Sequence, residues 1–185
     1  MRIIAGEARG RTLYAPKGME TRPTADRVRE SLFNILARRV TDARVFDAFA
    51  GSGAMSLEAL SRGARCVVLS DISREACRCV QRNAEACGFQ SRIRLVCGEW
   101  KKALAAEKEP FDLVFLDPPY RMLELNEMCA ALADSGLLAQ DAMMVLEHRT
   151  GEFGRPDKRF EEWKERTYAD TQIHFYLYAG LTEGE

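Results

Sequence analysis

Short apolar runs alternate along most of this chain with longer segments in which apolar residues recur at helical spacing. Five runs, RVFD, RCVVLSD, RIRLVC, FDLVFL and AMMVLEH, have the length and composition of buried strands. Between them, AMSLEALSRG and SREACRCVQRNAEACG are typical of helices that end at Gly63 and Gly88, and shorter helices are expected over about 100–107 and 122–134. Strands that alternate with helices at this spacing form βαβ units, so the pattern predicts a mainly parallel sheet with helices on both faces.

The two ends of the chain depart from this alternation. Residues 1–20 combine short apolar groups with glycines and arginines, which predicts a small hairpin, and a helix is expected over about 24–39. Near the other end, FEEWKERTYADTQIHFYLYAG predicts two strands joined by a turn, which would add an antiparallel edge to the sheet. We therefore expect one domain over 1–185, with an N-terminal extension over 1–40 and a Rossmann-like core over 41–185.

Composition places the chain among ordinary globular proteins, with 46% hydrophobic and 30% charged residues in a length of 185. Its apolar runs fall short of the roughly 18 residues that a membrane helix needs, and its first residues lack the apolar core of a secretory signal, so we expect a cytoplasmic protein. The six cysteines form no CxxC pair, and neither histidine lies at a metal-ligand spacing from them. We expect reduced cysteines, no metal and a monomer.

Positive charge is concentrated at the beginning of the chain. The net charge of the whole chain is −1, but residues 1–40 contain nine lysines and arginines against four acidic residues. This excess indicates a local surface for an anionic partner, although an ordinary solvated basic face would have the same composition. The candidate contacts are Arg9, Arg11, Arg22, Arg27 and Arg29.

Acidic residues follow four consecutive predicted strands. Ligands of open α/β sheets bind outside the carboxyl ends of the strands, so residues at these ends are candidates for a site. Each acid alone could be a helix cap or a turn residue, but four of them at one edge are difficult to explain by capping. The four residues are Asp47, Asp71, Glu99 and Asp117.

The turn after the first of these strands contains Gly51 and Gly53, which allow the backbone to approach a ligand closely. The third glycine of a dinucleotide fingerprint is missing, because Ala54, Met55 and Ser56 follow Gly53. Asp71 lies twenty residues after Gly51, where a carboxylate can accept hydrogen bonds from ribose hydroxyls. The features fit an adenosine-containing cofactor better than a nicotinamide dinucleotide.

The adenine end of such a cofactor would lie beside the third predicted strand. Glu99 follows that strand, where its carboxylate could bind the adenine amino group. Either Trp100 or Ile72 could then lie against the ring.

The segment FDLVFLDPPY ends a buried strand at a rigid turn. One interpretation is a strand followed by a structural loop. The other is that Asp117 and the carbonyl of Pro118 accept the N–H groups of an exocyclic amine, draw its lone pair out of conjugation and prepare it for methyl transfer. Pro119 would fix the turn and Tyr120 would stack on the base. This chemistry requires neither a metal nor a Ser, His or Cys nucleophile.

DAFAGSGAMSLEALSRGA together with FDLVFLDPPY resembles class I S-adenosylmethionine-dependent amino-methyltransferases. The N-terminal MRIIAGEARGRTLYAPKGMETRPTADRVRESLFNIL narrows the resemblance to the bacterial family that methylates guanine N2 in small-subunit (16S) ribosomal RNA. The resemblance implies a mostly parallel seven-stranded sheet with a C-terminal antiparallel hairpin. It also implies ribosomal RNA or the small subunit as partner and a flipped-out guanine held by the DPPY turn.

The family pattern assigns roles residue by residue. It implies that Asp117, Pro118, Pro119 and Tyr120 hold the guanine, and that Arg22 and Thr24 lie near the cofactor and the RNA entrance. Two positions depart from it, because Asp71 replaces the usual glutamate and Glu99-Trp100 replaces an aspartate turn. The implied cofactor contacts are Asp47, Phe49, Ala50, Gly51, Gly53, Asp71, Ile72, Glu99, Trp100 and Thr24.

Two other functions remain open from the sequence. An adenine, cytosine or glutamine amino-methyltransferase would share the DPPY motif, although such enzymes commonly carry Asn at the position of Asp117. A non-catalytic RNA-binding assembly factor on the same fold is the other alternative. The intact GxG turn, Asp71 and DPPY favour an enzyme.

Overall fold

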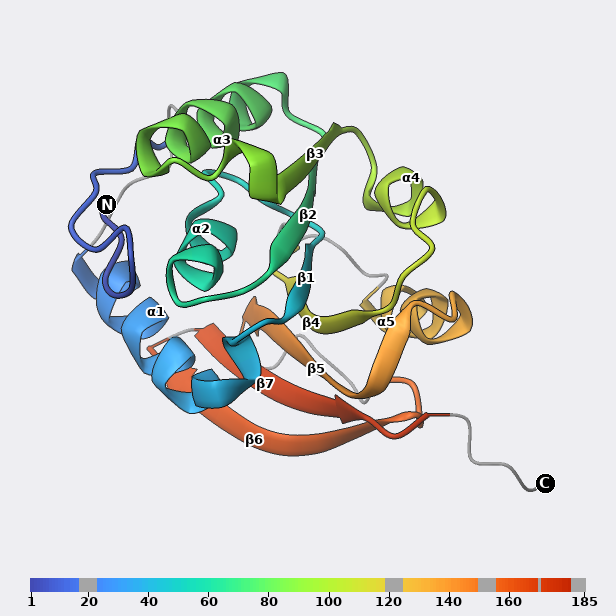
Figure 1. The fold of residues 1–185 in the computed structure, drawn as a ribbon. Coiled ribbons are helices and arrows are strands. Elements are labelled where there is room, and N and C mark those ends of the chain that lie inside the picture. The colour runs from blue at the N-terminus through green and yellow to red at the C-terminus, as the bar shows by residue number, and fades with distance from the viewer. Residues whose placement is uncertain (17–22, 119–124, 150–155, 170, 181–185) are drawn as a thin grey trace.

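A seven-stranded sheet in the order β3-β2-β1-β4-β5-β7-β6 forms the centre of the protein (Figure 1). The computed structural model describes residues 1–16, 23–118, 125–149, 156–169 and 171–180. The strands are β1 (Arg44–Asp47), β2 (Cys66–Asp71), β3 (Ile93–Cys97), β4 (Phe111–Leu116), β5 (Leu138–Arg149), β6 (Phe160–Tyr168) and β7 (Thr171–Tyr178). The helices are α1 (Pro23–Leu36), α2 (Ala54–Ser61), α3 (Arg74–Cys87), α4 (Trp100–Ala105) and α5 (Leu125–Asp134), with short 3₁₀ turns at Ala37–Val40 and Gln90–Arg92.

The strand directions agree with the sequence prediction. Strands β1 to β5 pair in parallel, and β7 pairs antiparallel with both β5 and β6. The turn between β6 and β7 includes Ala169, whose φ of 53° is left-handed, while residue 170 lies outside the described part of the chain. The predicted mostly parallel sheet with an antiparallel C-terminal hairpin is therefore confirmed.

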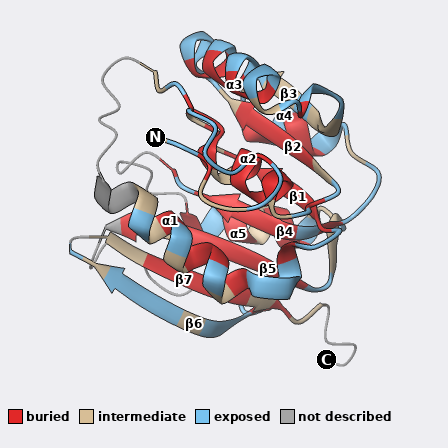
Figure 2. Ribbon diagram, turned by 60° about the vertical axis from the view of Figure 1, so that its left-hand side comes forward, coloured by how far each residue is buried: buried red, intermediate tan, exposed pale blue. Residues whose placement is uncertain are grey.

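The sheet separates two apolar cores. Figure 1 shows α1, α2 and α3 on one side of the sheet and α4 and α5 on the other. Because side chains alternate along a strand, Val45 and Phe115 face the first core, whereas Phe46 and Leu116 face the second. The central strands are buried along their length, and β6 is mostly exposed at the edge (Figure 2). No helix in the described residues is long and apolar enough to cross a membrane.

The N-terminal segment doubles back on itself and packs against α2. It forms an isolated bridge between Arg2 and Thr12 rather than the two strands of a full hairpin. The carboxylate of Glu58, which is fully buried, accepts hydrogen bonds from the backbone N–H groups of Ile4 and Ala5 at 2.8 and 3.1 Å. These buried hydrogen bonds join the first residues of the chain to the core.

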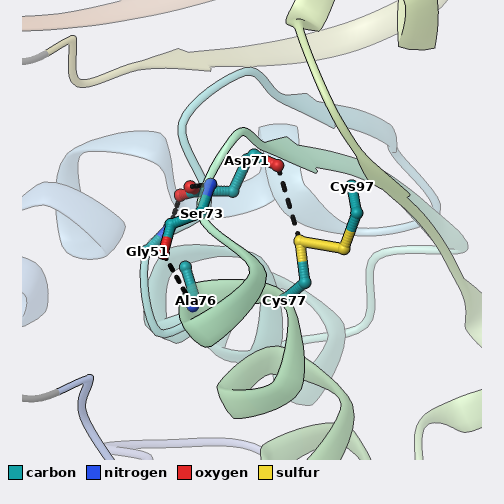
Figure 3. The surroundings of a disulfide bond; sticks show 6 residues. All are labelled: Gly51, Asp71, Ser73, Ala76, Cys77 and Cys97. Carbon is teal, nitrogen blue, oxygen red and sulfur yellow. Dashed lines mark hydrogen bonds between the residues drawn. A yellow bond between two sulfur atoms is a disulfide. The ribbon is translucent and has the colours of Figure 1, made fainter.

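One expectation about the cysteines is wrong. Cys77, near the start of α3, and Cys97, at the end of β3, form a disulfide (Figure 3). The Sγ atom of Cys77 also lies 3.4 Å from the carbonyl oxygen of Asp71. The two cysteines are 20 residues apart on different elements, so only the tertiary structure brings them together. Cys66, Cys79, Cys87 and Cys129 are free, as expected.

Candidate functional site

The strand order brings the four predicted acids to one edge of the sheet. Along the neighbouring strands β3, β2, β1 and β4, the strand ends carry Glu99, Asp71, Asp47 and Asp117 in that order. Asp47 pairs in register with Phe115, so Asp117 lies only two residues beyond the level of Asp47. The parallel pairing of these strands therefore arranges carboxylates from separate parts of the chain along one edge.

The turn after β1 is fastened by Asp71. Its carboxylate accepts the backbone N–H of Gly51 and that of Ser73, each at 2.8 Å (Figure 3). Gly51 and Gly53 have φ values of 53° and 76°, which favour glycine. A Cβ atom at Gly53 would lie 3.3 Å from the side chain of Val80, so α3 also restricts this position. Because a carboxylate has about four lone-pair sites, Asp71 can still accept hydrogen bonds from a ligand.

Asp47 is buried at the base of this turn. Its carboxylate accepts a hydrogen bond from Ser56 Oγ at 2.6 Å, which joins the end of β1 to α2. Burial raises the pKa of Asp47 to about 6; the hydrogen bond from Ser56 opposes this shift, and the nearby charge of Asp71 adds a smaller rise. A protonated and an ionised form of Asp47 are thus both accessible near neutral pH.

A cavity of about 140 Å³ opens between α1, the turn after β1, and the ends of β4 and β5. It brings together five of the residues that the sequence predicted, from two separate segments of the chain. Three carboxylates and several apolar side chains surround it, so it is a partly dry and acidic site. It is lined by Leu32, Asp47, Phe49, Ala50, Gly51, Ser52, Ala54, Met55, Phe115, Leu116, Asp117, Val145 and Glu147.

Glu147 is a residue of this site that the sequence analysis missed. Leu116 pairs with Leu146, so Asp117, directly after β4, and Glu147, within β5, lie at the same level. The side chain of Asp117 is exposed where it lines the cavity; desolvation by the protein around it, and then the charges of Glu147 and Asp47, raise its pKa well above the usual range. Burial also raises the pKa of Glu147. The acid near the end of the fifth predicted strand, AMMVLEH, was the signal that could have identified it.

The predicted adenine contacts differ in accessibility. Ile72, directly after β2, is 77% exposed. Trp100 is only 6% exposed and packs in the core beneath α4, so its indole ring contributes mainly to that core. Glu99 is exposed at the beginning of α4, and its side chain forms no cap hydrogen bond there. Of the two aromatic or aliphatic candidates, Ile72 is the one available to a ligand.

The remaining residues of the predicted guanine turn lie mostly beyond the described part of the chain. Pro118 is described and buried, directly after Asp117. Pro119 and Tyr120 are outside the described residues.

The prediction that Arg29 contacts RNA is wrong. Its side chain is 5% exposed and donates hydrogen bonds to the carbonyl oxygen of Arg2 at 2.6 Å and to Asp26 at 2.9 Å. Its Nε atom lies 3.8 Å from the buried carboxylate of Glu58. Arg29 therefore compensates a buried charge and holds α1 against the N-terminal segment.

The other predicted RNA contacts are exposed where they are described. Arg9 and Arg11 lie in the N-terminal segment, and Arg27 lies on α1. Arg22 is outside the described residues. Thr24 is the second residue of α1, which begins at Pro23, one residue earlier than predicted.

Comparison with known proteins gives matches over almost the whole chain. A family model described as "Conserved hypothetical protein 95" matches residues 1–177. "Ribosomal RNA small subunit methyltransferase D" of Escherichia coli (strain K12) is 38% identical over 185 residues, covering 100% of this chain and 92% of that protein. The protein of the same name from Haemophilus influenzae is 32% identical over 184 residues, covering 95% and 93%.

The similarity extends to solved structures. The Escherichia coli protein yhhF superposes with a TM-score of 0.86 at 36% identity, covering 96% of this chain and 97% of that chain. A hypothetical protein from Thermus thermophilus gives a TM-score of 0.78 at 32% identity, covering 95% and 98%. The Rossmann-like fold expected from the sequence is confirmed.

Proposed function

Because the chain belongs to the ribosomal RNA small subunit methyltransferase D family, we propose that it methylates ribosomal RNA, transferring the methyl group of S-adenosylmethionine to the exocyclic N2 amine of a guanine in the small-subunit RNA. The observation that carries the proposal is the cavity in which the turn after β1 and Asp117 face each other. The turn after β1 is the proposed site of the cofactor, and Asp117 is the proposed site of the amine.

The residues around the cavity fit this cofactor. The left-handed backbone of Gly51 and Gly53 permits a close approach of the methionine end, and Asp71 keeps lone pairs for ribose hydroxyls. The exposed side chain of Ile72 can lie against adenine, and Glu99 can accept the adenine amino group. S-adenosylmethionine, when bound, supplies an electrophilic methyl group on a sulfonium sulfur.

Asp117 is proposed to position the amine. Its carboxylate accepts one N–H, and the adjacent Pro118 carbonyl accepts another, which directs the nitrogen lone pair toward the cavity. The side chain of Asp117 is open to the cavity, as this role requires. The guanine must leave its stack to reach this position, and Pro119 and Tyr120 remain the predicted remainder of its binding turn.

A basic surface along α1 supports a ribosomal RNA partner. A cavity of about 460 Å³ is lined in part by Arg2, Arg9 and Arg27. A second cavity, of about 490 Å³, is lined in part by Arg27, Lys164 and Arg166. Both lie along α1, the same helix that contributes Leu32 to the methyl-transfer cavity, so RNA phosphates bound there would lie near the site.

Replacing Arg27 with glutamine is expected to weaken RNA binding without affecting chemistry. Since Arg27 is exposed and lines both basic cavities, its loss should raise the KM for RNA about three- to tenfold and reduce the salt dependence of binding by about one counterion. Steady-state kinetics at several salt concentrations measure both. Arg78→Gln, an exposed arginine on α3, is the matched control. A KM and salt slope equal to those of the control would exclude Arg27 from the RNA surface.

The proposed activity is tested with purified protein and cofactor carrying a labelled methyl group. We expect label to appear in small-subunit ribosomal RNA, and mapping of RNA from a strain lacking this protein should show one guanine without its N2 methyl group. Label in DNA or protein instead would favour another amino-methyltransferase. If calorimetric titration detects no binding of S-adenosylmethionine or its demethylated product, the proposal fails and a non-catalytic RNA-binding factor is favoured.

A further inference from the structure

Glu147 and Asp117 form a pair of carboxylates on neighbouring strands. The pairing of Leu116 with Leu146 places the two acids at the same level, and both line the same cavity. Side chains two residues apart on a strand lie on the same face of the sheet. Asp117 therefore lies on the face of Phe115, and Glu147 on the face of Val145. Phe115 and Val145 both belong to the core beneath α1 and α2. Glu147 is therefore directed to the face of the sheet on which the amine is proposed to bind.

The described residues that line the cavity give Glu147 no compensating positive charge. Asp47 and Asp117 are the other titratable groups among them. Among the elements around the cavity, α1 contributes Leu32 to its lining, and α2 contributes Ala54 and Met55. The neighbour of Glu147 on β7 is the apolar residue Ile173.

Among the side chains that the structure describes, the nearest titratable neighbours along the chain and across the sheet lie elsewhere; the side chain of Arg149, two residues after Glu147, is outside the described part. His148 points to the opposite face of β5, where its ring stacks on that of His174 at 5.0 Å. Arg166, on β6, pairs with Ile173 of β7, so it lies two strands away from β5. Within the described lining of the cavity, the acids therefore face one another without a cation.

Methyl transfer creates a proton that such a pair can accept. The lone pair of the amine nitrogen forms the bond to the methyl carbon while the carbon–sulfur bond breaks and its electron pair stays on sulfur. The nitrogen then carries a positive charge and one proton more than the product amine. That proton must leave along an existing hydrogen bond, and Asp117 is the proposed acceptor of an amine N–H.

We infer that Glu147 is a positioning residue for this proton: its carboxylate lines the same cavity as that of Asp117, at the same level of the sheet, so that the two acids together take up the proton released by methyl transfer. The inference rests on the proposed function. Glu147 acts through Asp117 and does not contact the amine. The raised pKa values of both groups agree with a pair that binds a proton readily. Water at the mouth of the cavity then removes the proton.

Single-turnover rates measured across pH test the inference. The rate of the wild-type protein should rise with pH as Asp117 ionises, with a midpoint well above the usual pKa of an aspartate. In Glu147→Gln the neighbouring negative charge is lost, the pKa of Asp117 falls, and the midpoint should move down by about one pH unit. The plateau rate should fall about tenfold, because the weaker base accepts the proton less readily. The affinity for S-adenosylhomocysteine should not change.

Two further variants separate this role from a structural one. Glu147→Asp keeps a carboxylate that is one methylene shorter, so its midpoint should shift in the same direction by about half a unit. Glu85→Gln makes the same chemical change at an exposed position of α3 and should leave the profile unchanged. Glu147→Gln should not lower the melting temperature at pH 8, since it removes a charge from a partly buried position.

A midpoint that stays at the wild-type pH in both Glu147 variants would overturn the inference, whatever the loss of rate. If Glu147→Gln does not fold, the midpoint of the pH profile of Glu147→Asp tests the inference on its own. The proposed function fails separately, when the wild-type protein transfers no methyl group at any pH.

Discussion

Asp117→Ala is expected to reduce the methyl-transfer rate at least about a thousand-fold, because the substitution removes the carboxylate that orients the amine and accepts its proton. The affinity for S-adenosylhomocysteine should remain nearly unchanged, since the turn after β1 is fastened by Asp71 rather than by Asp117. Single-turnover assays on small-subunit RNA and calorimetric titration measure the two quantities.

The stability of this variant distinguishes lost chemistry from lost folding. At neutral pH an acid whose pKa is raised in the folded state does not stabilise the fold, because its ionised form is disfavoured there. Asp117→Ala should thus melt at the wild-type temperature or above it. Asp134→Ala removes an exposed aspartate on α5 that pairs with Arg159 at 2.7 Å, and it should keep full activity. Full activity in Asp117→Ala would refute the assignment of the amine site.

Gly6→Ala is expected to lower the free energy of unfolding by about 3 kcal/mol, or the melting temperature by about 10 °C. Gly6 has a left-handed φ of 84°, and an added Cβ would overlap the backbone carbonyl of Ser61 at the end of α2. The same carbonyl accepts the N–H of Glu7, and Ser61 Oγ accepts that of Ala8 at 3.0 Å. The substitution therefore separates the N-terminal segment from α2.

Gly10→Ala is the matched control for this prediction. Gly10 has the same φ of 84°, but an added Cβ would meet no atom within 4 Å. Its cost should be only the backbone strain of alanine, about 1 kcal/mol. Chemical denaturation of the two variants gives the difference directly. Equal losses would show that the contact between Gly6 and Ser61 contributes nothing to stability.

The local pattern was sufficient to predict most of the fold. Apolar runs of strand length, the glycines that end two helices and the alternation in QIHFYLY are properties of adjacent residues, and they specified the strands, their order along the chain and the C-terminal hairpin. The N-terminal segment was less predictable, because its backbone forms hydrogen bonds with residues of α2 and not only within the segment. Its backbone N–H groups bond to Glu58 and Ser61, more than 50 residues away.

The sequence predicted those residues of the candidate site that lie at the end of a strand, because the end of each apolar run is visible in the sequence. Asp47, Asp71 and Asp117 were identified in this way, and the structure brings Asp47 and Asp117 into one cavity. Arg29 was misjudged, and the burial of Trp100 was not foreseen, because composition does not reveal burial. An arginine in a basic segment is typical of a surface, but the buried charge of Glu58 keeps this one inside.

The sequence by itself determined the strand–helix order and the acids at the strand ends, because both depend on residues adjacent in the chain. Only the tertiary structure decided that Glu147 lies level with Asp117, that Cys77 bonds to Cys97 and that Arg29 is buried. These facts depend on which strands become neighbours, in which register, and on which face each side chain emerges. Strand register is set by packing across the whole sheet, and no local pattern contains it.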